Sequence, residues 1–106
     1  MGRVVIVAYK PKAGKSRELE AAVAKHCRVL REEALITDRQ PVVMMAVDGT
    51  IIEVFEWRSA EAIAAAHVNP RVGALWSAFG AACDYVPLAT VAEAKQLFAE
   101  FAAIEP

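Results

Sequence analysis

Four short segments of this chain are apolar at nearly every position, and they constrain its fold more than any other feature. They are rich in β-branched and aromatic residues, which favours strands. A sheet with one solvated face should alternate polar and apolar residues, whereas these segments are apolar on both faces. We therefore expect a sheet that is covered on both sides. The expected strands are residues 3–10 (RVVIVAYK), 42–47 (VVMMAV), 51–57 (IIEVFEW) and 85–89 (YVPLA).

Helical periodicity separates these strands. Ser16 is a good N-cap for a first helix that runs to about Glu33. Ser59 caps a second helix, which Asn69-Pro70 interrupts and restarts, with the proline at the first helical position. The apolar stripe of the first helix is Leu19, Ala22, Val23, His26, Cys27 and Leu30, and that of the third is Val72, Leu75, Trp76, Phe79 and Cys83.

The resulting order, β-α-β-β-α-β, is that of the ferredoxin-like α+β plan, here with a split second helix. Asp48-Gly49 predicts a type I′ hairpin turn, and Pro87 predicts an edge position for the last strand. A capping box of Thr90 and Glu93 predicts an extra C-terminal helix over about 91–104. We expect its stripe to pack on the body or on a partner subunit; the stripe includes Leu97, Phe98 and Phe101.

A partner subunit follows from the excess of apolar residues. The 106 residues have room for one domain, 1–106, with its core at 3–89, yet 57% of them are hydrophobic against a usual 45–50%. The helices cover one face of the sheet, so we expect a homodimer in which two sheets pair through the other face. Met44, Met45 and their strand neighbours are candidates for this interface.

Charge and motifs exclude several classes of function. The 12 basic residues are scattered and the net charge is −1, which argues against nucleic-acid binding. No run approaches the roughly 18 apolar residues of a membrane span, and the N-terminus lacks a signal-peptide pattern, so we expect a cytoplasmic protein. A phosphate-binding loop would need a glycine where Tyr9 stands. Cys27 and Cys83 form no CxxC pair and should be reduced and buried.

Two titratable residues are candidates for catalysis. His67 ends an Ala-rich helix and could act as a base, or it could cap the carbonyls at the helix end. Glu53 shares its strand face with Ile51, Phe55 and Trp57. As an inward carboxylate it could be an acid or base; the alternative is an ion pair at a dimer seam or strand edge.

Other residues predict a binding pocket. Aromatic side chains could line a flat apolar site for an aromatic ligand, or they could simply be core. His26 lies on the apolar stripe of its helix, which indicates a hydrogen-bonded core or pocket-wall residue. The predicted substrate-binding set is Tyr9, His26, Trp57, Trp76, Phe79 and Tyr85. The histidines and cysteines lack ligand spacing such as HxxxH, so we expect no metal site.

Two segments, YKPKAGKSRELEAAV and EVFEWRSAEAIAAAHVNPRVGALW, carry a family resemblance. Over residues 3–89 the chain resembles the antibiotic-biosynthesis-monooxygenase-like (ABM) domains, which are dimeric α+β barrels. That resemblance implies a pocket between sheet and helices and, in several members, a histidine on the helix after the third strand. In the commonest alignment this histidine falls at Ala66, one residue before His67. Haem-degrading members use an Asn/Trp/His set, and here no asparagine precedes Asn69.

Two hypotheses of function follow. The resemblance implies a cofactor-independent monooxygenase that acts on a small aromatic or quinol-type substrate, with Tyr85 or Asp84 as a polar anchor. The alternative is a non-catalytic dimeric module that binds a small ligand or a protein. Haem degradation is a third option. A cavity of several hundred Å³ between the third helix and the sheet that holds His67 and a carboxylate favours the enzyme, whereas packed side chains there favour the module.

Overall fold

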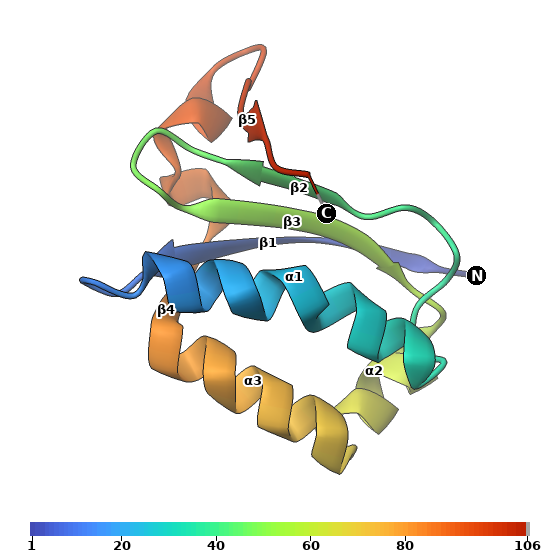
Figure 1. The fold of residues 1–106 in the computed structure, drawn as a ribbon. Helices are drawn as coiled ribbons and strands as arrows, with labels where there is room; N and C mark the ends of the chain where they lie inside the picture. The colour runs from blue at the N-terminus through green and yellow to red at the C-terminus, as the bar shows by residue number, and fades with distance from the viewer. Residues whose placement is uncertain (106) are drawn as a thin grey trace.

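A computed structural model describes residues 1–105. The centre of its sheet consists of β1 (Arg3–Pro11) and β3 (Ile51–Trp57). The two strands are antiparallel, with Val5 opposite Phe55 and Val7 opposite Glu53. Beyond β1 lies β4 (Cys83–Val86), and beyond β3 lie β2 (Val42–Met45) and the short β5 (Ala102–Ala103). The strand order is therefore β4-β1-β3-β2-β5, with every neighbouring pair antiparallel (Figure 1).

The three helices α1 (Ser16–Glu32), α2 (Ala60–His67) and α3 (Pro70–Ala82) lie together on one face of the sheet (Figure 1). This α+β arrangement is consistent with the predicted ferredoxin-like plan. The apolar stripe predicted for α1 is buried in full. Within residues 1–105, no helix has the length and apolar character that a membrane crossing requires.

Side-chain caps set the starts of two helices. The hydroxyl of Ser59 accepts a hydrogen bond from the amide of Ala62, and the amide oxygen of Asn69 accepts from the amides of Arg71 and Val72. These two predicted caps are confirmed, as is Pro70 in the first turn of α3. The predicted cap of Ser16 is wrong, because α1 begins at Ser16 and no side chain caps it.

The hairpin between β2 and β3 differs from the predicted type I′ turn. Only Gly49 has a positive φ there, of 93°, whereas a type I′ turn needs positive φ at both central residues. The amide of Gly49 donates to the carbonyl of Ala46, and the amide of Thr50 donates to the carboxylate of Asp48. The loop is thus a type I turn followed by a left-handed glycine, and β2 ends at Met45 rather than Val47.

The C-terminal helix predicted over about 91–104 is wrong. This stretch contains one 3₁₀ turn, Ala92–Lys95, and the strand β5. The predicted capping box does not form, because the Thr90 hydroxyl donates to the carbonyl of Pro87 and the Glu93 carboxylate accepts from the amide of Val47. A short isolated helix is marginal in water, and the open edge of β2 offers backbone partners instead.

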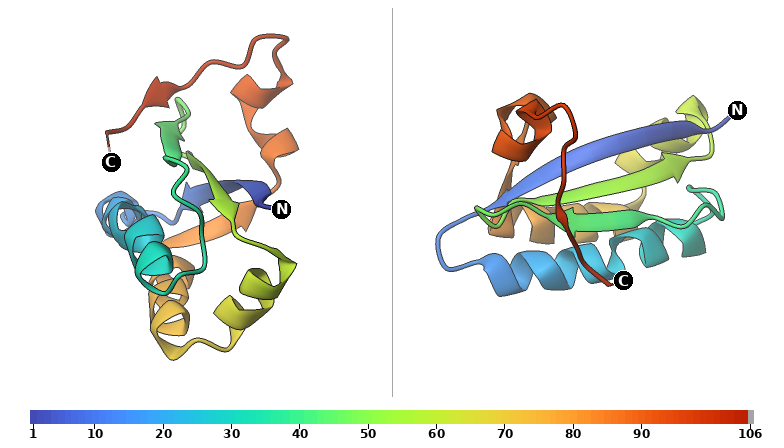
Figure 2. Two further views of the ribbon diagram at one scale, coloured as in Figure 1. Left: turned by 90° about the vertical axis from the view of Figure 1, so that its right-hand side faces the viewer. Right: turned by 90° about the horizontal axis from the view of Figure 1, so that it is seen from above.

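The C-terminal segment, residues 88–104, crosses the sheet face opposite the helices (Figure 2). Its Val91 and Phe101 pack with Ala8, Ile52 and neighbouring apolar residues of that face. Phe101 therefore packs on the body as predicted. The side chains of Leu97 and Phe98 do not, because they are 94% and 80% exposed.

The rest of this sheet face is open. Val4, Ile6 and Val42 are each at least half exposed on it. Met44 lies on the same face under the C-terminal segment, whereas Met45 packs against the core on the helix side. The assignment of Met45 to the predicted interface is therefore wrong, since neighbouring strand residues point to opposite faces. The last strand lies at the sheet edge, as Pro87 predicts, but its predicted bounds of 85–89 are wrong. It spans Cys83–Val86, so Pro87 lies just after it and Cys83 belongs to it rather than to the third helix.

Candidate functional site

A cavity of about 470 Å³ lies between the helix face of the sheet and helices α1 and α3. Strand alternation places every second residue of β1 and β3 on this face. The cavity is lined by all six residues of the predicted substrate-binding set, together with Val5, Val7 and Phe55. We call it the aromatic cavity. The enzyme hypothesis required a cavity at this position that also holds His67 and a carboxylate, and neither lines this one. The occupant of the cavity stays a prediction.

Aromatic rings pack against one another around the aromatic cavity, and all of these pairs but Tyr9–Phe79 are edge to face. The ring of Tyr9 lies 4.8 Å from that of Phe79 and 5.6 Å from that of Tyr85, centroid to centroid. The imidazole of His26 lies 4.9 Å from Phe79 and 5.4 Å from Phe55. Of the rings in these pairs only that of Tyr85 is exposed, so it offers the most accessible stacking position to a flat ligand.

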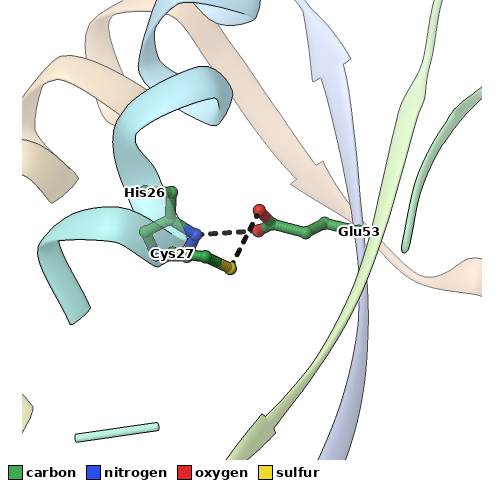
Figure 3. Close-up of side chains that lie close together, drawn as sticks. All are labelled: His26, Cys27 and Glu53. Atoms are coloured by element: carbon green, nitrogen blue, oxygen red, sulfur yellow. Dashed lines mark hydrogen bonds and ion pairs between the residues drawn. The ribbon is translucent and has the colours of Figure 1, made fainter. Parts of the chain in front are cut away.

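Glu53 holds a buried carboxylate at the meeting point of sheet and helices. Its side chain is 1% exposed, and its Oε1 accepts hydrogen bonds from the Tyr9 hydroxyl at 2.8 Å and from His26 Nδ1 at 2.7 Å. Its Oε2 accepts a long contact of 3.5 Å from the thiol of Cys27 (Figure 3). Glu53 faces the helices from the central strand β3, so the predicted ion pair at a dimer seam or strand edge is wrong.

The tautomer of His26 follows from its second partner. The indole N–H of Trp76 can only donate, and it lies 3.2 Å from His26 Nε2. Nε2 must therefore carry a lone pair, and the ring hydrogen sits on Nδ1, which donates to Glu53. The result is a histidine whose acceptor nitrogen binds Trp76, another residue of the cavity wall, and whose donor nitrogen is fixed by a carboxylate.

Burial and the nearby Glu53 charge keep the other two donors protonated. Desolvation, followed by the charge of Glu53 and the hydrogen bond to it, raises the pKa of the Tyr9 hydroxyl well above its ordinary value. The same causes raise the pKa of the Cys27 thiol. Cys27 is thus a hydrogen-bond donor at neutral pH, and its environment is the reverse of one that activates a thiolate nucleophile.

His26, Cys27 and Glu53 place one ligand atom each within 4.8 Å of one another, so the cluster could be taken for a metal site. The geometry does not fit one. A metal on Nδ1 would move the ring hydrogen to Nε2, where it would oppose the N–H of Trp76. The 2.7 Å between Nδ1 and Oε1 is a hydrogen bond, and it is shorter than the spacing of two ligands around Zn²⁺, about 3.3 Å from bonds of about 2.0 Å.

The structure does not bring the two predicted catalytic residues together. His67 is exposed, and its Nδ1 bonds with the carbonyl of Ile63 at 2.8 Å within its own helix. Its ring packs edge to face with that of Trp76, at 5.2 Å from centroid to centroid. The predicted anchor Asp84 is also exposed, in an ion pair with Lys12 at 3.3 Å.

The partner of Glu53 is therefore His26, and sequence reasoning did not join them. It placed His26 on a buried stripe and Glu53 on an apolar strand. Two inward polar side chains in otherwise apolar elements require hydrogen-bond partners, and this requirement could have indicated that they pair with each other. It took Cys27 for a plain apolar residue and missed its bond to Glu53.

Comparisons with known proteins add no relative: no family model, no curated protein and no solved structure matches this chain. The resemblance to ABM domains remains a prediction from short motifs.

Proposed function

We propose that this protein is a small oxygenase that oxidises an electron-rich aromatic or quinol-type substrate with O₂ and without a bound metal or flavin. One observation carries the proposal: His26 lines an aromatic cavity of about 470 Å³, its Nε2 accepts from Trp76 of the same cavity wall, and its Nδ1 donates to the buried carboxylate of Glu53. A histidine oriented by a carboxylate is an arrangement suited to a general base.

The substrate enters the aromatic cavity and stacks against the rings of its wall. A hydroxyl or acidic C–H of the substrate takes the place of the Trp76 N–H at His26 Nε2. Nε2 then accepts the proton, and the carboxylate of Glu53, at 2.7 Å from Nδ1, stabilises the imidazolium. The Tyr9 hydroxyl keeps this carboxylate in place through its own 2.8 Å bond to Oε1.

Oxygen reacts with the carbanion that remains. For an activated methylene between aromatic rings, the carbanion transfers an electron to O₂, a C–O bond forms between the two radicals, and the proton from His26 gives a hydroperoxide. Loss of the second C–H proton and cleavage of the O–O bond yield a ketone and water. The balance is R₂CH₂ + O₂ → R₂C=O + H₂O, so no other oxidant or reductant is consumed.

Oxygen uptake with a panel of anthrones, naphthols and hydroquinones tests the proposal. We expect uptake that is lowered roughly 100-fold or more in His26→Gln, the usual scale for loss of a general base. His67→Gln is the matched control, because the chain has two histidines and this one lies outside the cavity. Equal rates in the two variants, or no uptake across the panel, would refute the proposal.

A second function, a non-catalytic ligand-binding module, is favoured by a different observation. Trp76 already occupies Nε2, and every buried polar side-chain atom among residues 1–105 has a hydrogen-bond partner. Such a satisfied network is also what a purely structural role needs. Ligand-induced quenching of tryptophan fluorescence without O₂ uptake would select this function. Haem titration followed by absorbance tests the haem hypothesis.

The homodimer is part of the proposal. On the open part of the sheet face, the exposed fractions of Val4, Ile6 and Val42 are 59%, 50% and 53%. The C-terminal segment covers the rest of this face and exposes Leu97 and Phe98. A second copy that packs on this face would bury all five side chains. Ile6→Lys should convert the dimer to a monomer in light scattering; a monomeric wild type would refute the dimer.

A further inference from the structure

A second cavity, of about 360 Å³, lies on the other side of Glu53. It is bounded by α1, by strands β2 and β3, and by the end of the C-terminal segment, where the amide of Ile104 donates to the carbonyl of Val43. Its apolar wall is aliphatic throughout, in contrast to the aromatic cavity. That wall is formed by Val23, Ala24, Pro41, Val43, Ile51 and Ile104. We call it the aliphatic cavity.

Polar groups are unevenly distributed along the aliphatic cavity. Arg28 and Arg31 line it at the C-terminal end of α1, and neither makes a side-chain hydrogen bond or ion pair within residues 1–105. Val23 lines it one to two turns earlier, and Glu20 lies at the far end. From Val23 to Arg31 the helix rises about 12 Å. The α1 wall of the cavity therefore changes from aliphatic to basic, and the exposed side chains of Gln40 and Glu105 line the cavity as well.

Glu53 contributes an acceptor with spare capacity between these two regions. Its Oε1 receives two short hydrogen bonds, whereas Oε2 receives only the thiol of Cys27 at 3.5 Å. Glu53 and Cys27 both line the aliphatic cavity. A carboxylate oxygen can accept two hydrogen bonds, so Oε2 is open to a donor from a ligand in this cavity.

We propose that the aliphatic cavity binds a medium-chain 3-hydroxy carboxylate. The carboxylate pairs with Arg28 and Arg31, and the 3-hydroxyl, two carbons away, donates to Oε2 of Glu53. The acyl chain lies along Val23, Ile51 and Ile104 toward the N-terminal half of α1. The absence of aromatic rings from this wall favours a flexible aliphatic chain over a flat ring. This site is independent of the oxygenase proposal and needs no catalytic activity.

Calorimetric titration with three probes tests each contact separately. 3-Hydroxyoctanoate carries all three features, octanoate lacks the hydroxyl, and methyl 3-hydroxyoctanoate lacks the charge. We expect 3-hydroxyoctanoate to bind roughly tenfold more tightly than octanoate, which is the usual scale of a hydrogen bond to a charged group. The methyl ester should also bind more weakly. Equal affinity for all three probes, or no binding at millimolar concentration, would overturn the proposal.

Matched variants locate the site. Val43→Phe fills the aliphatic cavity, and Val5→Phe makes the same change at a half-buried strand position that lines the aromatic cavity. We expect only the first to abolish binding. Arg28→Gln with Arg31→Gln should weaken 3-hydroxyoctanoate but leave its methyl ester unchanged, and Lys25→Gln, on the exposed side of α1, should change neither. Circular dichroism confirms folding of each variant. Loss of binding in Val5→Phe alone would assign the probe to the aromatic cavity and refute this site.

Discussion

Tyr9→Phe isolates one bond of the buried network. The substitution removes the hydroxyl that donates to Glu53 Oε1 at 2.8 Å and retains a ring of the same shape. The ring contacts with Phe79 at 4.8 Å and with Tyr85 at 5.6 Å can therefore persist. What changes is the solvation of a carboxylate that is 1% exposed. A hydrogen bond to a charged group contributes about 1.5–3 kcal/mol, so we expect this loss in the free energy of unfolding.

Urea unfolding followed by circular dichroism measures this loss. A domain of this size has a stability of about 5–15 kcal/mol, and the melting temperature should fall by roughly 10 °C. Tyr85→Phe is the control, because Tyr85 is 55% exposed. It should change the stability by less than about 0.5 kcal/mol. A loss below about 0.5 kcal/mol for Tyr9→Phe would show that its hydroxyl does not stabilise the buried carboxylate.

The pH dependence provides a second test. Because the pKa of Tyr9 is raised in the folded chain, both states hold the proton below pH about 10, and the stabilisation is then complete. Above this pH the unfolded chain releases the proton and the folded chain keeps it. The stability then falls by about 1.4 kcal/mol per pH unit from this group. Tyr9→Phe lacks this ionisable hydroxyl, so the difference in free energy of unfolding between wild type and variant should decrease above pH about 10.

Three further predictions concern the thiol, the C-terminal segment and metals. Burial and the nearby Glu53 raise the pKa of Cys27. Native protein at pH 8 should therefore react with a thiol reagent at least 100-fold more slowly than urea-denatured protein. Equal rates would show an accessible thiolate. Phe101→Ala should lower the free energy of unfolding by about 1–3 kcal/mol because Phe101 packs on the sheet. Leu97→Ala, at a side chain that is 94% exposed, should lower it by less than about 0.5 kcal/mol. The reverse order in urea titrations would contradict the packing. Added Co²⁺ should produce no thiolate-to-cobalt charge-transfer band, and a band that disappears in Cys27→Ala would show that the cluster binds metal after all.

Local signals in the sequence predicted the elements well where a single mechanism acts. Ser59 and Asn69 cap their helices as predicted, because a side-chain oxygen next to free amides needs no distant partner. The Thr90–Glu93 capping box failed for the opposite reason. Both side chains found other partners, Pro87 and Val47, and one of these lies far away in the chain.

The sequence also predicted the residues of the aromatic cavity but not their roles. Periodicity shows which side chains point inward, and all six predicted pocket residues line that cavity. It does not show which inward groups meet across the fold. His67 has the features of a base but faces solvent, whereas His26 has those of a core residue and bonds with Glu53 over 27 positions of sequence.

The four apolar strand segments by themselves determined that the chain forms a sheet with two faces to cover. This conclusion requires only that neighbouring residues of a strand point to opposite faces and that exposed apolar surface is unfavourable. Tertiary structure decided what covers them. The C-terminal segment, predicted as a helix, lies across part of the open face instead. Only the tertiary structure could also place Glu53 at the aliphatic cavity, because its three hydrogen-bond partners come from two other elements, β1 and α1. A carboxylate that is 1% exposed must be satisfied by such neighbours, and their convergence is a property of packing.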